Sequence, residues 1–410
     1  MKFLPLLLLT AHSLMGADLA VLLPNTKNNL RVESTRIEAQ RANKQLEQIK
    51  AAYYPTLNAT ALYRKKDKTT AFEPKTTQGL EISTEVTLFD GLRREAAIKA
   101  THSTITQTNQ TMEQEEQNVF LETIIAYYDY FDAHARLDAL RDKKVELSAQ
   151  VERFKVLVKN DLATGDILKS LIASKLEADY DEQNQNIALQ RSRKNLELLS
   201  GLTIDTLEYK ELNTPLVEKI ERHDLQSDRA MVETLRYSEG RYTYLPTVSL
   251  QGKHREMNYN DYNTMGGANI QPERQNEITA SVSMTLFDMG SISKEKEQAR
   301  LTTLKAQKMV EYKAKTLQNE AEIAVMTLNA SQSAYTAAKA EEEARNEAFK
   351  TIKQRFEAGL VNTTTYLSEL SSLSQSRAKV QSSRNALQIS KANVAYSYGI
   401  DLMTLIEEKK

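Results

Sequence analysis

The sequence "VTLFDG" (residues 86–91) returns as "MTLFDMG" (residues 284–290) further along the chain. The two shared phenylalanines lie 287 − 89 = 198 residues apart. Before each copy, apolar and polar residues alternate, which is the period of a β-strand with one wet face. After each copy the chain runs without proline or glycine as far as Asn160 and Ala358, as a long helix does. Each copy therefore predicts a strand that turns directly into a long helix.

Two β-hairpins are predicted, one over about residues 56–89 and the other over about residues 246–287. In each hairpin the apolar residues fall on one face, because they recur at every second position. The other face is polar and includes Glu81, Glu85 and Glu277. A sheet of this kind has one side that faces water and one that needs a cover of lipid or protein.

The same order of elements occurs twice: a leading helix, a hairpin, a long helix, a turn and a return helix. The first repeat covers residues 18–215 and ends in an irregular connector, and the second covers residues 216–410 and ends in a tail. The predicted long and return helices cover about residues 90–160, 167–200, 291–358 and 364–396. The dipeptide "RF" precedes both turns, at 153–154 and 355–356, and the first copy has about one extra helical turn between "RF" and the break.

The first 17 residues read as a secretory signal peptide. Lys2 precedes a short apolar run, and small residues follow at Gly16 and Ala17. The alternative interpretation is a buried N-terminal helix. The run is shorter than the ~20 apolar residues that a membrane-spanning helix needs. An exported chain of this sequence is therefore either soluble in the periplasm or enters a membrane by a route other than helices.

The composition excludes several classes of function. A net charge of −1 argues against binding to nucleic acid. No nucleotide-binding or hydrolase motif occurs, so we expect no enzyme activity and no cofactor. The five histidines lack the spacing of metal ligands. One group of polar residues resembles a ligand set but spreads over several faces of a helix: Asp129, Asp132, His134 and Asp138.

Four strands cannot close a barrel by themselves, because small membrane-spanning barrels begin at 8 strands. Open strand edges are not tolerated in lipid, where each unsatisfied backbone group costs several kcal/mol. The chain is therefore expected to pool its strands with other copies, two giving 8 strands and three giving 12. A barrel of 8 strands is filled by its own side chains, so a conducting lumen favours three or more copies. Glu81, Glu85 and Glu277 would face that lumen.

The ordered duplicate of these motifs resembles the TolC-type outer-membrane efflux protein family. The motifs are "YYPT" (53–56) and "YLPT" (244–247), the two "LFD" corners, and "RF" ahead of each turn. The resemblance implies a mixed α+β membrane protein that forms a homotrimer with a 12-stranded barrel. It also implies a long tunnel of antiparallel, coiled-coil helices that extends the barrel into the periplasm.

The same resemblance implies a location and partners. The barrel would lie in the lipid of the outer membrane of a Gram-negative bacterium. The chain would be the passive exit duct of a tripartite efflux or type I secretion system. Its partners would be a periplasmic adaptor protein and an inner-membrane pump of the RND or ABC type. The alternative function is a periplasmic coiled-coil adaptor or tether without a pore, which would have no use for four strands of membrane length.

The family places a gate and an adaptor contact at the helical turns. Carboxylates after the second turn ring the closed tip in this family, and the matching positions fall near Thr365 and Ser368, with Glu369 adjacent. Asp166 falls near the corresponding place after the first turn; its alternative role is to cap a helix. The residues expected to contact an adaptor are Asp161, Leu162, Ala163, Thr164, Gly165, Gly359, Leu360, Val361, Asn362 and Thr363.

Overall fold

The computed structural model describes residues 18–70, 73–262 and 272–406. The predicted signal peptide, residues 1–17, lies outside the described residues. The chain forms two compact units. The sheet unit comprises residues 36–110 and 225–312, and the helical unit comprises residues 1–35, 111–224 and 313–410. No helix in the described ranges combines the length and the hydropathy needed to cross a bilayer.

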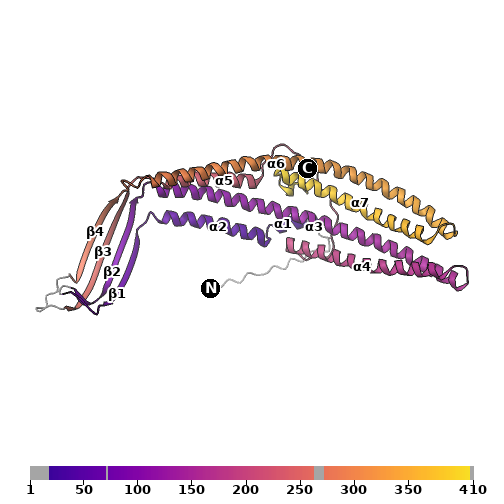
Figure 1. The fold of residues 1–410 in the computed structure, drawn as a ribbon, viewed down its shortest axis with the longest axis horizontal. Helices are drawn as coiled ribbons and strands as arrows, with labels where there is room; N and C mark the ends of the chain where they lie inside the picture. Colours follow the sequence, from indigo (N-terminus) through magenta and orange to yellow (C-terminus); the bar gives the residue numbers. More distant parts are fainter. Residues whose placement is uncertain (1–17, 71–72, 263–271, 407–410) are drawn as a thin grey trace. The chain divides into compact units, whose positions relative to one another are not determined.

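The helices and strands follow one another in the same order in both halves of the chain (Figure 1). The helices are α1 (Leu19–Thr26), α2 (Leu30–Ala51), α3 (Arg93–Lys159), α4 (Gly165–Ser200), α5 (His223–Ser238), α6 (Ser291–Glu357) and α7 (Thr363–Tyr398). The strands are β1 (Thr56–Lys65), β2 (Pro74–Phe89), β3 (Thr247–Tyr262) and β4 (Arg274–Ser283). The short 3-10 helices are η1 (Glu239–Arg241) and η2 (Leu402–Leu405).

The described strands form one antiparallel sheet in the order β1-β2-β3-β4 (Figure 1). Pairing of β2 with β3 joins the two hairpins, with Glu81 opposite Arg255. The register places most apolar residues of the four strands on one face and most of the polar residues on the other. Much of the apolar face is exposed, and Ile278 on it is 82% accessible to solvent. Within the described residues, β1 and β4 each have a neighbouring strand on one side only.

The two repeats have equal helices. Both α3 and α6 contain 67 residues, and both α4 and α7 contain 36. The offset of 198 residues found at the corners holds for both pairs of helix starts, since 291 − 93 and 363 − 165 are equal to it. The extra helical turn predicted between "RF" and the break in the first copy is confirmed: α3 ends at Lys159, 159 − 154 = 5 residues after Phe154, whereas α6 ends at Glu357, 357 − 356 = 1 residue after Phe356. The two dipeptides occupy non-equivalent positions, about one turn apart on equal helices.

Each strand-to-helix corner contains two consecutive residues with positive φ. In the first corner these are Gly91 (71°) and Leu92 (66°), and in the second Met289 (54°) and Gly290 (80°). An aspartate directly before these two residues caps the helix that follows: the Asp90 carboxylate accepts a hydrogen bond of 2.8 Å from the backbone N–H of Arg94. The Asp288 carboxylate accepts the equivalent bond from Ile292. The "LFD" motif therefore supplies the cap that turns a strand into a helix.

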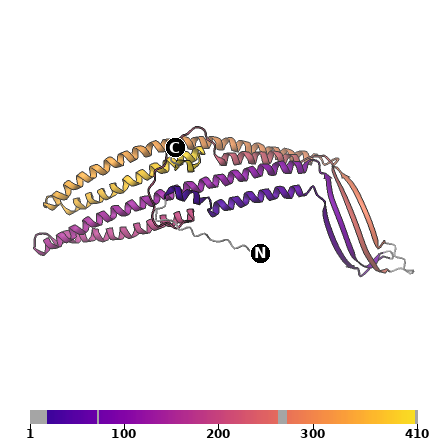
Figure 2. The ribbon, with the colours of Figure 1, turned by 180° about the vertical axis from the view of Figure 1, so that it is seen from behind.

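In the helical unit, α3 lies beside α4, and α6 lies beside α7 (Figures 1 and 2). A segment without regular structure, residues 202–222, crosses this unit and is fixed by buried tyrosines. Lys210 N–H donates to the Tyr127 hydroxyl (2.9 Å), and the Tyr128 hydroxyl donates to the Lys210 carbonyl (2.8 Å). The second repeat, predicted to begin with its leading helix at residue 216, instead begins with an irregular segment, and α5 starts at His223. The Glu221 N–H in that segment donates to the Tyr398 carbonyl at 3.0 Å.

Candidate functional site

The two helical turns of the helical unit have the same backbone design. Asp161 and Gly359 adopt positive φ values of 55° and 74°. In the next position, the N–H of Leu162 donates to the Leu157 carbonyl (2.9 Å), and the N–H of Leu360 donates to the Arg355 carbonyl (2.8 Å). This bond closes the end of each helix. It also leaves the two leucine side chains 73% and 76% exposed at equivalent places.

Side chains from both turns meet in the helical unit. Arg153 Nη2 donates to the Glu357 carbonyl (2.9 Å). The rings of Phe154 and Phe356 stack with centroids 5.4 Å apart, and Phe356 also stacks on Tyr366 at 4.4 Å. A groove of about 760 Å³ lies between the turns and is lined by residues of both. The turns thus form one surface, although they are about 200 residues apart in sequence.

The predicted gate residues differ in their surroundings. Asp166 lines the groove between the turns. The Thr164 hydroxyl and the backbone N–H groups of Asp166 and Ile167 bond to its carboxylate and lower its pKa. The N-cap of α4 is Thr164, so the alternative role of Asp166 as a helix cap is wrong. Asp166 lies instead in the first turn of α4, where the helix dipole favours a negative charge.

The gate residues that follow the second turn form hydrogen bonds or ion pairs with other residues of the same chain. The Thr365 hydroxyl and N–H both donate to the Asn362 side-chain oxygen, at 2.8 Å. Asn362 is the N-cap of α7, as Thr164 is of α4. Glu369 lies 3.4 Å from Arg345. The Ser368 carbonyl accepts the Ser372 hydroxyl at 2.9 Å.

The residues predicted to contact an adaptor divide by their role. Leu162 and Leu360 are exposed, whereas Ala163 and Val361 pack against the hydrophobic cluster beneath the turns. The remaining residues shape the backbone. Asp161 and Gly359 have positive φ, and Thr164 and Asn362 are N-caps. Gly165 and Thr363 each begin a helix.

A carboxylate that the sequence analysis missed joins three helices above the turns. Glu146 on α3 accepts hydrogen bonds from Lys353 Nζ on α6 (2.7 Å) and from the Tyr366 hydroxyl on α7 (2.6 Å). Gln150 Nε2 donates to the same carboxylate at 3.1 Å. Glu146 is one of many charged residues on a polar helix, so only the folded arrangement distinguishes it.

Replacing Glu146 with glutamine is expected to destabilise the protein by about 1–2 kcal/mol, because Lys353 loses a charge-assisted hydrogen bond. Heat unfolding followed by circular dichroism measures the change. Glu152 on the same helix is exposed and paired with Lys155, so Glu152→Gln is the matched control and should have little effect. Equal unfolding temperatures for the two variants would contradict a structural role for Glu146.

The stability contributed by Glu146 should depend on pH. Burial raises the pKa of Glu146, but the hydrogen bonds from Lys353, Tyr366 and Gln150 outweigh it, so the pKa lies below its usual 4.5. A carboxylate with a lowered folded-state pKa stabilises the protein fully above the unfolded value and loses this effect as pH falls through the folded value. Unfolding midpoints measured between pH 7 and pH 3 should therefore converge for the wild type and Glu146→Gln at the acid end.

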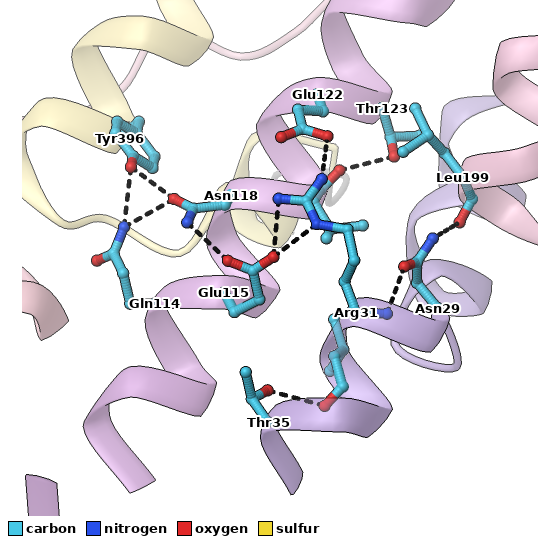
Figure 3. A network of polar contacts seen from close by, with 12 residues as sticks. Asn29, Arg31, Thr35, Gln114, Glu115, Asn118, Glu122, Thr123, Leu199 and Tyr396 are labelled. Atoms are coloured by element: carbon cyan, nitrogen blue, oxygen red, sulfur yellow. Dashed lines mark hydrogen bonds and ion pairs between the residues drawn. The ribbon is translucent and has the colours of Figure 1, made fainter. Parts of the chain in front are cut away.

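A second polar network lies farther from the turns along α3, in the helical unit (Figure 3). Arg31 on α2 donates to Glu115 (2.8 Å) and Glu122 (2.6 Å) on α3. The Tyr396 hydroxyl on α7 donates to Asn118 (2.6 Å) on α3. These contacts fasten α2 and α7 to α3. Glu115 and Glu122 on α3 therefore have a structural role. No group of three or more His, Cys, Asp or Glu side chains arranged to hold a metal occurs in the described part of the chain.

The sheet unit brings the three predicted lumen glutamates to one face. The strand register places Glu81, Glu85 and Glu277 on the polar side. Arg255 Nε and Nη2 both donate to Glu81, at 3.0 Å. Lys253 is directly opposite Glu277 on the neighbouring strand. The negative charge of Glu81 is therefore opposed by its ion pair with Arg255, and Lys253 places a second positive charge on the same face.

Comparisons with known proteins agree with this geometry. The family described as "Outer membrane efflux protein" matches residues 25–155 and 218–399. The Campylobacter jejuni CmeC outer membrane channel is similar in fold, with a TM-score of 0.78 and 16% identity over 95% of this chain and 86% of CmeC. Neisseria gonorrhoeae MtrE, an outer membrane channel in its open state, gives 0.74 and 14% over 95% and 91%.

The outer membrane protein VceC from Vibrio cholerae gives a TM-score of 0.73 and 14% identity over 94% of this chain and 96% of VceC. No curated protein matches the chain. The family is one of channels rather than enzymes. Because the match spans most of its residues, the chain belongs to the outer membrane efflux protein family and is an outer-membrane exit duct of an efflux system.

Proposed function

We propose that three copies of this chain pool their sheets into one 12-stranded barrel in the outer membrane. The observation that carries the proposal is the pair of open edges at β1 and β4. In hydrocarbon each unpaired backbone group costs several kcal/mol, so β4 of one copy must pair with β1 of the next. Two copies would give 8 strands, too few for an open lumen.

The exposed apolar face of the sheet supports its placement in lipid. Leu57, Ile278 and Val282 are each more than two-thirds exposed on that face. An apolar surface spread over four strands is far from what a water-soluble sheet presents. The opposite face would line the lumen, with Glu81, Glu85 and Glu277 in contact with water.

The helices would continue the duct into the periplasm. Each repeat, residues 18–215 and residues 216–410, would supply one antiparallel pair of long helices, so three copies give a ring of twelve. Residues 1–17 would direct export as a signal peptide. Transport would be passive, and its energy would come from an inner-membrane pump of the RND or ABC type, in a tripartite efflux or a type I secretion system.

The tip of the helical unit would be both gate and docking surface. The exposed leucines Leu162 and Leu360 are suited to contact with a periplasmic adaptor, because they repeat at equivalent turns. Asp166 would face the narrow end of the duct, since it lines the groove between the turns. Thr365, Ser368 and Glu369 would supply hydroxyls and one paired carboxylate near that end.

The competing function is a periplasmic tether without a pore. The four strands argue against it, because a tether gains nothing from an exposed apolar sheet. The distinguishing experiment extracts the protein from membranes with detergent and measures its mass and its conductance in planar bilayers. We expect a trimer that conducts. A single chain that keeps its sheet signal, or a protein found in the soluble periplasmic fraction, would overturn the proposal.

A further inference from the structure

The second strands of the two hairpins end differently at the corners, although the repeat makes these ends equivalent. The offset of 198 residues relates residues 86–89 to residues 284–287. Residues 86–89 belong to β2, whereas β4 stops at Ser283 and leaves residues 284–287 outside the sheet. Phe287 is 80% exposed, while its equivalent Phe89 is half-buried. At this end β4 is therefore 287 − 283 = 4 residues shorter than the repeat predicts.

The difference follows from the neighbouring strand. β1 begins opposite Glu85, so β3 alone holds residues 86–89 in the sheet. β3 in turn begins opposite Ser283, so it offers β4 no pairing beyond that residue. On its other side β4 is an edge of the described sheet. Residues 284–287 thus lack the neighbour that keeps their equivalents in a strand, and a second copy of the chain would supply it.

The repeat also preserves strand register. β2 and β4 are related by the offset of 198 residues, and β1 and β3 by 191 residues, since "YYPT" begins at 53 and "YLPT" at 244 (244 − 53 = 191). Thr56 pairs with Glu85 in the first hairpin. Adding 191 and 198 to these positions gives Thr247 and Ser283, which form a pair in the second hairpin. The two offsets therefore convert one strand register into its equivalent.

We propose that β4 pairs with β1 of the next copy in the register that joins β2 to β3 within the chain. The pair of Ser83 and Lys253 becomes Ser281 and Leu62 of the next copy (83 + 198 = 281 and 253 − 191 = 62). Both of these positions lie on the polar face of the sheet, so each strand keeps its face. The register rests on the proposed function, because it requires the sheets of separate copies to form one barrel.

The ends of the strands favour this register over its neighbours. It places Phe287 opposite Leu57 of the next copy, directly before the corner (89 + 198 = 287 and 248 − 191 = 57). A slide of two residues one way would place Pro55 opposite Phe287, and proline has no N–H for the ladder. The opposite slide would place Leu57 opposite Met289, whose positive φ of 54° ends the strand. A slide of one residue would turn the apolar face of one strand to the polar side.

Charge favours one of the competing registers. The proposed register places Arg64 of the next copy opposite Thr279 (255 − 191 = 64 and 81 + 198 = 279). The slide that brings Pro55 opposite Phe287 would place Arg64 opposite Glu277 instead. An exposed ion pair contributes little to stability, and a long side chain such as that of arginine also reaches a diagonal neighbour across two strands. The pair of Arg64 and Glu277 therefore does not require the slide.

Disulfide trapping tests the register, because the chain contains no cysteine. β1 and β4 lie at opposite edges of the described sheet, so a disulfide between them must join two copies. After oxidation of the purified full-length protein, we expect S281C/L62C to give a covalent trimer on a denaturing gel. V282C/A61C, derived from the pair of Thr84 and Gly252, tests the same register on the apolar face.

Two shifted pairs are the matched controls. S281C/T60C reports the slide that places Arg64 opposite Glu277, and S281C/R64C reports the opposite slide. The Cβ atoms of a disulfide lie about 3.5–4.5 Å apart, whereas those of diagonal neighbours are about 7 Å apart. The proposed pairs should therefore give about tenfold more cross-linked protein than the shifted pairs. Each single-cysteine variant should give none.

Stronger cross-linking in a shifted pair, or equal cross-linking in all pairs, would overturn the register. A covalent dimer from S281C alone would overturn it as well, because two β4 edges would then pair with each other. Mass in detergent and conductance are measured on the same variants under reducing conditions. If both are normal while no proposed pair cross-links preferentially, the register fails and the duct stands. If the unmodified protein is a single chain that does not conduct, the duct proposal fails.

Discussion

Replacing Gly399 with alanine is expected to destabilise the helical unit by about 3 kcal/mol. Gly399 ends α7 with φ of 77°, where a side chain costs about 1–2 kcal/mol. A Cβ there would lie 2.5 Å from the Glu221 carbonyl and 2.8 Å from the Arg222 nitrogen, so the extended segment before α5 must move. Crowding of this kind adds about 1–3 kcal/mol. Heat unfolding followed by circular dichroism measures the loss.

Gly201 is the matched control, since it ends α4 as Gly399 ends α7. Its φ is 69°, yet a Cβ added there would meet nothing within 4 Å. Gly201→Ala should therefore show the backbone cost alone, about 1–2 kcal/mol. If the two variants unfold at the same temperature, contact between residues 221–222 and the end of α7 does not stabilise the protein.

Replacing Arg255 with glutamine is expected to make the duct more selective for cations. Glu81 would lose the guanidinium that donates to it at 3.0 Å, and each of the three proposed copies would lose one positive charge from the lumen. A charge on a wall that faces water changes the energy of a passing ion by about 1 kcal/mol or less. The ratio of K⁺ to Cl⁻ permeability should rise roughly two- to threefold on that scale. The reversal potential across a planar bilayer in a KCl gradient measures this ratio.

Two further variants make the selectivity result specific. Glu81→Gln should shift the reversal potential in the opposite direction, because it leaves Arg255 unpaired. Arg274→Gln removes the same charge from the other face of the sheet, where Arg274 pairs with Glu256, and should leave the ratio unchanged. An unaltered reversal potential in both Arg255→Gln and Glu81→Gln would mean that this face does not line the conducting path.

Local patterns in the sequence were sufficient to predict the strands and the corners. Alternation over β1, β2 and β4 is a property of each strand alone, and it identifies the face to which Glu81 and Glu277 belong. The aspartate caps at the corners act over four residues, so Asp90 could be recognised without the fold. Whatever a few neighbouring residues determine was accessible to sequence reasoning.

Register between distant elements was not accessible in the same way. The helix α5 begins at His223 rather than at residue 216, and the segment before it is held by the hydrogen bond from the Glu221 N–H to the Tyr398 carbonyl, at 3.0 Å. This correction comes from a contact between residues far apart in sequence.

The sequence predicted where the charged residues of the candidate site lie, but not the residues with which they pair. The sequence indicated carboxylates on the wet face of the sheet and around the turns. It could not show that Arg255 neutralises Glu81 or that Arg345 pairs with Glu369, because cross-strand and cross-helix partners follow from three-dimensional proximity. Glu146 escaped notice for the same reason, since two of its three partners, Lys353 and Tyr366, are 207 and 220 residues away in sequence.

The open edges at β1 and β4 also bear on how the protein is made. A newly exported chain would present two rows of unpaired backbone groups and an oily surface to water, which together invite aggregation. In the proposed trimer, a single chain cannot complete the barrel until two further copies bind to it. Biogenesis should then depend on protein concentration and on escort proteins that shield the immature sheet, so overproduction would favour inclusion bodies more than extra ducts.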